Sequence, residues 1–523
     1  MNRKIWKALG IAVCMLALAA PCAMAETHSH MVSNDGILKQ AIKAINNSSD
    51  DNANEIILTS GFTLEGDTTE YTLRRGTTTI KGEGNTITVN PGAGIKVTGE
   101  KTVLNLGAEG YAEKLTIDGN AKGAFITVSG GATAHMYENV TLQNRQQVDQ
   151  ACVVLEENSV FTMYGGVIQN CKGKYGGVSL KNGSRFIMEG GTISECEANA
   201  GGGLYADNSI VTIKKGTISG CKAGYGYGGG LYAANNSTVT IEGGTISGCC
   251  TTSDIGMGGG LYAYKSTITI SGGTIKNNKA IYGGGVALNN SWINPITNWT
   301  VIGNEAYKTK SGNGGIGGGI YLDSVSMVVS DGSNRIYNNQ AERHGADICM
   351  EIGASIKLPI AANMGATFGD SGIKIDNWYN DKPPYKPSKD VDPVDVSETL
   401  TNPRSLVASY KADPVHIEID ANGGVGGSGS QTVQKGTTIT LEAPTKEGHL
   451  FKGWKDEKGN SYPAGEDGKV NITATGDMTL TAEWKKLPSA ENLPKTGDES
   501  PVLLWGAVLA VSAAACFMLR RRK

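Results

Sequence analysis

The chain has no excess of positive charge. Its 47 lysines and arginines are balanced by 50 aspartates and glutamates, which leaves a net charge of −3 at pH 7. No block of basic residues lies between the two ends of the sequence. Proteins that bind nucleic acid need clustered basic residues to contact phosphates. The sequence therefore predicts no nucleic-acid partner.

Aromatic residues are scarce and glycine is abundant. Phenylalanine, tryptophan and tyrosine make up 6% of the chain, whereas 73 of its 523 residues are glycine, about twice the usual share. Glycine at this level without a period is typical of low-complexity or disordered chains. Here the glycines recur with a period, so the composition predicts a folded repeat.

Two glycine-rich motifs return at intervals of about 25 to 30 residues, a period typical of a solenoid. The first reads Gly-Gly-Thr-Ile-Ser, and the second reads Gly-Gly-Gly-Leu-Tyr-Ala and falls between copies of the first. A short run of alternating polar and apolar residues precedes the first motif. Copies of the first motif begin at Gly165, Gly190, Lys215, Gly243 and Gly272, and copies of the second at Gly201, Gly228, Gly258, Gly283 and Gly317.

Alternation within these runs predicts an all-β fold, a right-handed parallel β-helix over residues 34–375. Three short strands in each period would make one triangular coil, and successive coils would stack about 4.8 Å apart. β-branched residues suit such stacks, and the hexapeptide period of a left-handed β-helix is absent. The expected inner walls are Val211, Ile213, Val239, Ile241, Ile268 and Ile270; Ile193, Ile218, Ile246 and Ile275; and Leu204, Leu231, Leu261 and Val286.

Cysteines occupy one position of the repeat, three residues after an inward isoleucine, and asparagine takes the equivalent place in later copies. A buried turn position that accepts a small thiol or an amide explains this alternation. The spacing of the coils also permits disulfides, so packed thiols and partial disulfides both remain open. A metal site is not expected, because no histidine shares the position. The residues are Cys171, Cys196, Cys221, Cys249, Asn278 and Asn339.

Residues 34–47 predict an amphipathic helix that covers the first coil, with Asn34 or Asp35 as its N-cap. Without a cover, the open strand edge of that coil would template aggregation. Together with the Gly-rich motifs, this segment resembles the pectate-lyase-like β-helix superfamily, and specifically the adhesin repeats similar to those of polymorphic outer-membrane proteins. The resemblance implies the fold and a role in adhesion.

A second module follows a proline-rich segment that predicts a semi-rigid linker. Its motifs Val-His-Ile-Glu-Ile-Asp-Ala-Asn-Gly-Gly, Gly-His-Leu-Phe-Lys-Gly-Trp and Met-Thr-Leu-Thr-Ala-Glu-Trp resemble the internalin-B B-repeat, or Listeria–Bacteroides repeat, a small β-grasp-like domain. Its aromatic residues are expected in the core, with a carbohydrate site on the two tryptophans as the alternative. The linker is 376–414, the module 415–485 with the core Phe451, Trp454, Leu480 and Trp484, and a short spacer 486–492.

The N-terminal segment, 1–25, predicts a secretory signal helix. Basic residues precede an apolar run, and an Ala-x-Ala site at Ala23 and Ala25 places the mature N-terminus at Glu26. Cys22 also allows a lipoprotein interpretation, which the proline before it disfavours.

The C-terminal segment, 493–523, combines a pentapeptide, an apolar run at about 501–519 and four basic residues. The run is long enough for a transmembrane helix, and the cations would stay on the cytoplasmic side. The pentapeptide resembles the LPxTG sorting signal of Gram-positive surface proteins, which implies processing by a sortase and covalent attachment to peptidoglycan. An ordinary membrane anchor is the alternative. The motif residues are Leu493, Pro494, Thr496 and Gly497, with cleavage after Thr496 and linkage through its carboxyl group.

The sequence predicts no catalytic residues, cofactor or metal. Glycosidases need two carboxylates 5 to 9.5 Å apart, and in a solenoid these would recur at one position of the coil. No such recurrence, nucleotide-binding loop or nucleophile elbow is present. The pair His28 and His30 could hold a metal, but a flexible tail is the preferred interpretation.

Four tyrosines follow inward residues and are expected to point out from one wall. Stacked in register, they would form a platform for sugar rings or a partner protein; shielding the backbone is the simpler role. The sequence thus predicts a cell-wall-anchored adhesin for a host or environmental glycan or protein. A wall-bound polysaccharide lyase or glycosidase and a structural coat protein are the alternatives. The tyrosines are Tyr205, Tyr232, Tyr262 and Tyr321.

Overall fold

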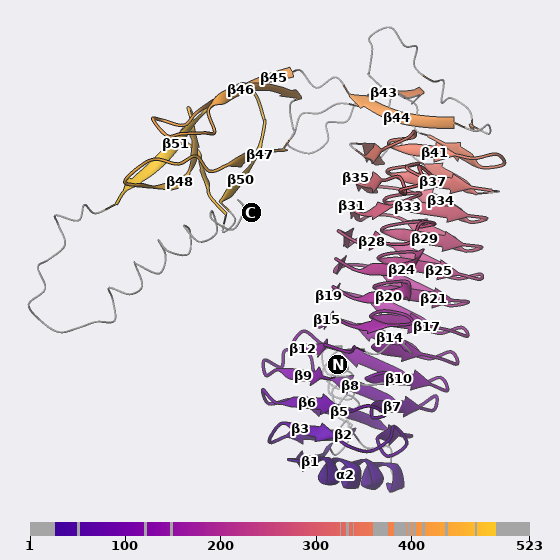
Figure 1. Ribbon diagram of the computed structural model, residues 1–523. Coiled ribbons are helices and arrows are strands. Elements are labelled where there is room, and N and C mark those ends of the chain that lie inside the picture. Colours follow the sequence, from indigo (N-terminus) through magenta and orange to yellow (C-terminus); the bar gives the residue numbers. More distant parts are fainter. Residues whose placement is uncertain are drawn as a thin grey trace, which may run out of the picture. The chain divides into compact units, whose positions relative to one another are not determined.

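The structure, a computed structural model, describes two compact units of the chain (Figure 1). The first contains the described residues up to 410, and the second those from 414 onward. The predicted signal peptide, its cleavage residues Ala23, Ala25 and Glu26, and the sorting residues Leu493, Pro494, Thr496 and Gly497 lie outside the described residues. These are 27–49, 53–119, 123–146, 150–324, 326–330, 334–337, 339–358, 375–380, 394, 399–400, 404–410, 414–434, 438–465 and 468–487.

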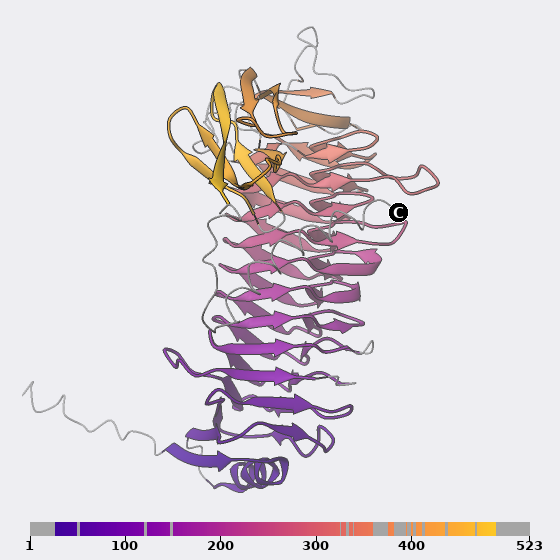
Figure 2. The same cartoon turned by 60° about the vertical axis from the view of Figure 1, so that its left-hand side comes forward.

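The first unit is a solenoid of stacked coils, as Figures 1 and 2 show from two sides. Equivalent strands of successive coils pair in parallel and form four sheets along its length, here named A to D. In the regular part, the chain passes in each coil from sheet C to sheet A, then to sheet B and sheet D. The predicted all-β solenoid is confirmed.

Sheets A and B form two of the walls. In the part of the chain that the structure describes, sheet A has 13 strands and sheet B has 11. Sheet A contains β1 (Thr27–Val32), β2 (Ala53–Leu58), β5 (Thr77–Lys81), β8 (Val103–Leu106), β11 (Thr133–Met136), β14 (Val160–Met163), β18 (Arg185–Met188), β22 (Ile210–Ile213), β26 (Thr238–Ile241), β30 (Thr267–Ile270), β34 (Trp292–Ile296), β38 (Met327–Ser330) and β42 (Ser355–Lys357). Sheet B contains β3 (Phe62–Leu64), β6 (Thr86–Val89), β9 (Leu115–Asp118), β12 (Val140–Gln143), β15 (Val167–Gln169), β19 (Thr192–Ser194), β23 (Thr217–Ser219), β27 (Thr245–Ser247), β31 (Thr274–Lys276), β35 (Thr300–Ile302) and β39 (Arg335–Tyr337).

Sheet C forms the third wall, and the short strands of sheet D lie between sheets B and C along the chain. Sheet C contains β4 (Thr72–Leu73), β7 (Ile95–Thr98), β10 (Ile126–Ser129), β13 (Val153–Leu155), β17 (Val178–Leu180), β21 (Leu204–Asp207), β25 (Leu231–Ala234), β29 (Leu261–Tyr264), β33 (Val286–Asn289), β37 (Ile320–Asp323), β41 (Ile348–Met350), β44 (Arg404–Tyr410) and β43 (Ile375–Asn380). Sheet D contains β16 (Lys172–Gly173), β20 (Glu197–Ala200), β24 (Lys222–Tyr227), β28 (Cys250–Thr251), β32 (Lys279–Ala280), β36 (Glu305–Ala306) and β40 (Gln340–Ala341).

Like residues of successive repeats stack on each other inside the solenoid. Ile193 of β19 pairs with Ile218 of β23, which in turn pairs with Ile246 of β27. The three predicted inner walls are buried throughout. Strand alternation directs every second side chain inward, and parallel pairing in register places identical side chains about 4.8 Å apart. The repeated hydrophobic positions therefore form the core.

The prediction of three strands in each coil is wrong for the coils that contain sheet D. After the turn that follows sheet B, the chain extends for a further two to six residues and pairs with the next coil. These strands carry small inward residues, such as Ala198 and Ala223, which are buried. Their shortness leaves too little alternation for the sequence to indicate a strand.

Helix α2 (Asp35–Asn47) covers the first coils, as predicted for residues 34–47 (Figure 2). The side chain of Asn34 caps it by accepting a hydrogen bond of 3.0 Å from the backbone N–H of Ile37. Its apolar face, which includes Leu38 and Ile42, is buried. The interpretation of His28 and His30 as a flexible tail is wrong, because both lie in β1, which pairs with β2.

Two antiparallel strands close the other end of sheet C. β44 pairs with β41, and β43 pairs with β44. Both strands fall within or at the edge of the segment predicted as a linker, 376–414, so that prediction is wrong for residues 376–380 and 404–410. Antiparallel pairing stops the parallel stacking and covers the edge of β41, which would otherwise be open.

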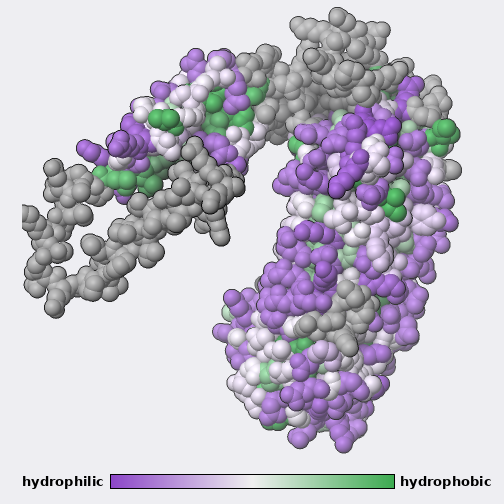
Figure 3. Space-filling model, viewed as in Figure 1, coloured by the Kyte–Doolittle hydropathy of each residue, from purple (hydrophilic) through white to green (hydrophobic). Residues whose placement is uncertain are grey.

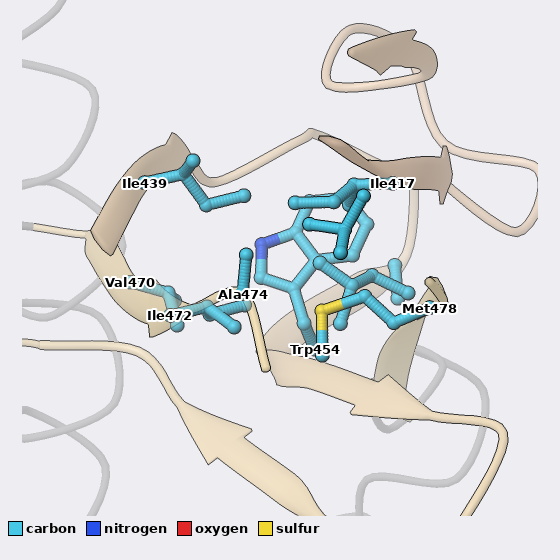
Figure 4. Close-up of a cluster of buried hydrophobic side chains, with 10 residues drawn as sticks. Ile417, Ile439, Trp454, Val470, Ile472, Ala474 and Met478 are labelled. Atoms are coloured by element: carbon cyan, nitrogen blue, oxygen red, sulfur yellow. The ribbon is translucent and has the colours of Figure 1, made fainter. Parts of the chain in front are cut away.

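The second unit is a small β module. Its larger sheet has the order β46 (Gly429–Gln434), β45 (Pro414–Asp420), β51 (Met478–Lys486), β48 (His449–Asp456) and β49 (Ser461–Pro463), and β47 (Thr438–Glu442) pairs with β50 (Lys469–Thr473). Trp454 lies at the centre of its core (Figure 4). Trp454 and Leu480 are fully buried, whereas Phe451 and Trp484 pack against the core and stay partly exposed.

Within the described residues, no helix has both the length and the apolar character needed to cross a membrane. The segment predicted as transmembrane, 501–519, lies outside them.

Candidate functional site

A buried polar column runs along the corner between sheets B and D. The residue before each of the first seven column positions has a left-handed backbone conformation, as at Asn170 (φ 54°) and Gly220 (φ 63°). This turn directs the next side chain into the interior. The column is Arg145, Cys171, Cys196, Cys221, Cys249, Asn278, Asn304 and Asn339, all of them buried. Arg145 and Asn304 were not predicted from the sequence, although each follows an inward residue by three positions.

The asparagines of this column bind one another in series. The Asn278 side-chain amide donates to Asn304 Oδ1 at 3.0 Å, and the Asn304 amide donates to Asn339 Oδ1 at 2.9 Å. The Asn339 amide donates to Asp347 Oδ1 at 2.8 Å, which ends the series at a buried carboxylate. Such a network is stable only while each member keeps its partners.

The cysteines of the described residues are free thiols: Cys152, Cys171, Cys196, Cys221, Cys249, Cys250 and Cys349. Each column thiol donates a hydrogen bond to the carbonyl oxygen two residues earlier, at the end of the sheet B strand. For Cys196 the acceptor is the Ser194 carbonyl oxygen, at 3.3 Å. Burial raises the pKa of Cys171. No group of three or more histidine, cysteine or acidic side chains suited to a metal ion occurs among the described residues.

An aromatic layer covers the outer face of sheet C and is the candidate ligand site. Its inner row lies on the sheet itself, where parallel pairing places Tyr205, Tyr232 and Tyr262 on three successive coils. The next coil carries Ala287 at this position, and Tyr321 follows on the coil after it. The structure therefore brings three of the four predicted tyrosines together and separates Tyr321 from them.

An outer row of residues lies over the inner row. Tyr227, Met257, Tyr282, Ile316 and His344 form a ladder of single parallel bridges, one on each coil. The Tyr227 and Tyr262 rings stack with centroids 5.4 Å apart, and the Tyr282 and Tyr321 centroids are 5.3 Å apart. The layer is thus two side chains deep.

Glycine makes this second row possible. Gly228, directly after Tyr227, has a φ of 63°, and a Cβ there would lie 2.3 Å from the Leu231 carbonyl oxygen. Only glycine allows the chain to turn back so closely over the strand that follows. Each Gly-Gly-Gly-Leu-Tyr-Ala motif therefore places the residue before it on top of the sheet.

The prediction that the four tyrosines form an exposed platform is wrong for three of them. Tyr205, Tyr262 and Tyr321 are only 7%, 4% and 7% exposed. The outer-row residues Tyr227 and Tyr282 pack on Tyr262 and Tyr321, and Tyr175 stacks on Tyr205 with ring centroids 4.0 Å apart. Tyr232 and the outer-row residues Tyr227, Met257 and Tyr282 are half-buried. Two strongly exposed apolar side chains lie next to the layer along the chain: Tyr225 and Ile255, 66% and 54% exposed, two residues before Tyr227 and Met257.

Polar side chains line one edge of the layer. Asp207, Asn289 and Asp323 occupy one register position at the ends of their sheet C strands. Asn289 donates to Asp323 at 2.7 Å, and Asn235 donates to Asp207 at 2.8 Å. Lysines cover two of the rings nearby: Lys265 lies 5.0 Å from the centroid of Tyr264, and Lys181 lies 5.1 Å from that of Tyr175.

Alkaline pH is expected to destabilise the solenoid through this layer. Burial raises the pKa of Tyr232 to about 12 and also raises those of Tyr205, Tyr262 and Tyr321. Above about pH 10 the unfolded chain loses these phenolic protons while the folded chain keeps them. The free energy of unfolding should therefore fall by about 1.4 kcal/mol per pH unit for each buried tyrosine.

Denaturant titrations between pH 9 and 11.5 test this effect. Replacement of Tyr232 with phenylalanine should make the decline less steep, whereas replacement of the exposed Tyr225 should leave it unchanged. Equal slopes for the Tyr232→Phe variant and the unaltered chain would contradict the assignment.

Comparison with known proteins identifies two segments of the chain. Residues 151–341 match the family described as right-handed β-helix region, and residues 416–483 match the Listeria–Bacteroides repeat domain. The first match agrees with the coils of sheets A to D, and the second with the small β module. The predicted handedness of the solenoid and the predicted repeat are thereby confirmed.

One relative is a protein of Evansella cellulosilytica described as a Gly-rich membrane protein. It is 28% identical over 155 residues, which cover 29% of this chain and 16% of the relative. The match thus spans about a sixth of the length of that protein. No solved structure matches the chain.

Proposed function

We propose that this chain is a surface protein of a Gram-positive cell envelope that acts as an adhesin and binds a glycan through the exposed part of the aromatic layer. The observation that carries the proposal is the row of half-buried side chains Tyr227, Met257 and Tyr282, which runs over successive coils on the same wall as the carboxylate and amide groups. Ligand sites commonly combine apolar and aromatic surface with a few polar groups that fix orientation.

The two ends of the sequence support a location outside the cell. A signal peptide over 1–25 would export the chain, and sortase would then join Thr496 to peptidoglycan. The relative described as a membrane protein and the Listeria–Bacteroides repeat fit a place in the cell envelope. In this proposal, the precursor is held in the plasma membrane only until Thr496 is transferred.

The chemistry of the layer favours a sugar chain as the ligand. A tyrosine offers an apolar ring face beside a polar hydroxyl group, which matches a sugar that has apolar C–H faces and hydroxyl edges. The rings of Tyr175 and Tyr264 are already covered by lysines, so contact is expected at Tyr225, Tyr227 and Tyr282. Asp207 and Asn289 at the edge of the layer would bind sugar hydroxyls.

The spacing of the carboxylates at this edge favours binding of a sugar chain over its cleavage. Asp207 and Asp323 occupy the same register position four coils apart, a separation of about 19 Å at 4.8 Å per coil. Glycosidases hold their two carboxylates 5 to 9.5 Å apart across the scissile bond. These two carboxylates are therefore placed to bind separate parts of one extended sugar chain.

Binding of residues 26–496 to glycan and matrix-protein arrays tests the proposal. We expect retention on glycans, with an affinity that falls at least tenfold in the Tyr225→Ala variant. The matched control is Tyr164→Ala, because Tyr164 is a partly exposed tyrosine at the end of β14 on sheet A. Binding to matrix proteins alone, or equal loss in both variants, would count against the aromatic layer as a glycan site.

A further inference from the structure

A row of glycines faces the buried polar column from the start of each sheet C strand. The row contains Gly177, Gly203, Gly230, Gly260, Gly285 and Gly319, each directly before its strand. A Cβ added at Gly177 would lie 3.4 Å from Cys196 Sγ, and one at Gly203 would lie 3.2 Å from Cys221 Sγ. Glycine is therefore required where a column side chain already fills the space.

Two other residues take this position at the ends of the row. Asp347 directly precedes β41, and its carboxylate accepts the hydrogen bond from Asn339 of the column. Cys152 directly precedes β13, whose Val153 pairs with Val178 after Gly177. At the Asp347 end, a larger side chain thus replaces glycine and binds the column directly.

Cys152 has a thiol as its counterpart in the column. Val153 pairs with Val178, and Ile168 pairs with Ile193. Cys152 therefore occupies the same place relative to Cys171 in its coil as Gly177 does relative to Cys196 in the next. By analogy with the 3.4 Å and 3.2 Å at Gly177 and Gly203, the Cys152 Cβ is expected at a similar distance from Cys171 Sγ. A disulfide brings each Cβ to about 3 Å from the opposite sulfur. Both side chains are buried, 0% and 1% exposed.

We propose that Cys152 and Cys171 form a disulfide in the exported protein, which fixes the first coil of the cysteine column. The two thiols lose two protons and two electrons, and a disulfide-bearing thiol oxidoreductase outside the membrane accepts them and becomes a dithiol. Because both thiols are buried after folding, this exchange takes place while the chain folds.

The column thiols themselves are less suited to pair with one another. Cys196, Cys221 and Cys249 all donate to the carbonyl oxygen two residues earlier, at 3.3 to 3.4 Å, so their side chains share one orientation. Neighbouring column thiols do interact, but side chains of one orientation on successive coils lie beside each other, which suits packing better than the geometry of a disulfide. Cys152 approaches Cys171 from a different corner of the coil, and the two thiols interact there.

Refolding of the full chain in a mixture of reduced and oxidised glutathione tests the proposal. The refolded protein is denatured with N-ethylmaleimide present and digested, and linked peptides are identified by mass. We expect one linked pair, Cys152 with Cys171, and a melting temperature about 4 °C above that of the same protein refolded with reductant.

The matched variant is Cys152→Gly, which introduces the residue that the other coils carry. It should fold, show no linked peptide and melt at the same temperature with or without reductant. Cys250→Ser should keep the link, because Cys250 lies in sheet D outside the pair. A link between Cys171 and Cys196, or full alkylation of Cys152 and Cys171 in the oxidatively refolded chain, would overturn the proposal.

Discussion

Replacement of Asn304 with leucine is expected to lower the free energy of unfolding by about 4 kcal/mol. The Asn304 amide donates to the Ile275 carbonyl oxygen at 3.0 Å and to Asn339 Oδ1 at 2.9 Å. Its own side-chain oxygen accepts from the backbone N–H and the amide of Asn278, both at 3.0 Å. Leucine fills the space but leaves these buried partners unpaired, and each unpaired group costs about 1 to 3 kcal/mol.

Urea unfolding followed by far-UV circular dichroism measures this loss. In a solenoid the stability of a coil depends on its neighbours, so the coils on both sides of Asn304 should unfold at lower urea concentration. Asn313→Leu is the control, since Asn313 is exposed in a loop of the same coil region. A loss below about 1 kcal/mol in Asn304→Leu would mean that the asparagine series adds little to stability.

The repeat made most of the solenoid predictable. Each Gly-Gly-Thr-Ile copy carries the same inward isoleucine. Parallel pairing places Ile218 next to Ile193, as their equal positions in the repeated motif imply. The inner walls depend only on alternation within strands and on a constant order of strands, both of which the sequence displays. Helix α2 was predictable because its apolar face and its cap, Asn34, are local features.

Features that depend on contacts between distant or irregular segments were not predictable. Strands of sheet D as short as Cys250–Thr251 show no alternation, and β44 follows a proline-rich segment that suggests a linker. The burial of Tyr262 depends on single residues of the outer row, such as Tyr227, which are not part of any recurring motif. Only the backbone turn at Gly228 shows that the chain folds back over the sheet.

The column shows which local signal was available. The left-handed residue before each column position is asparagine or glycine in most coils, as at Asn144, Asn170 and Gly248. These residue types tolerate that conformation best. Asn or Gly two residues after the inward side chain marks Arg145 and Asn304 together with Cys171, Cys221 and Cys249, whereas Glu195 takes this place before Cys196.

Replacement of Trp454 with alanine is expected to unfold the β module while the solenoid stays folded. Trp454 is fully buried among Ile417, Ile472 and Met478 (Figure 4), and loss of a buried tryptophan side chain costs about 3 to 5 kcal/mol. A single core of about 70 residues rarely supplies more than that. The solenoid has its own core and its own capping elements, so its stability does not depend on Trp454.

Limited proteolysis followed by mass spectrometry distinguishes the two units, with new cleavage sites expected only within 414–487. Trp292→Ala provides a control, because Trp292 lies in β34 of the solenoid and is 45% exposed. The face of the solenoid seen in Figure 3 is mainly hydrophilic. Trp454→Phe should lower the free energy of unfolding less than Trp454→Ala, because it keeps an aromatic ring in the core. It also removes an indole N–H that is buried without a hydrogen-bond partner among the described residues. Cleavage that spread through the coils in Trp454→Ala would show that the solenoid relies on the module. Cleavage confined to the module would instead mean that the aromatic layer can be tested for binding without it.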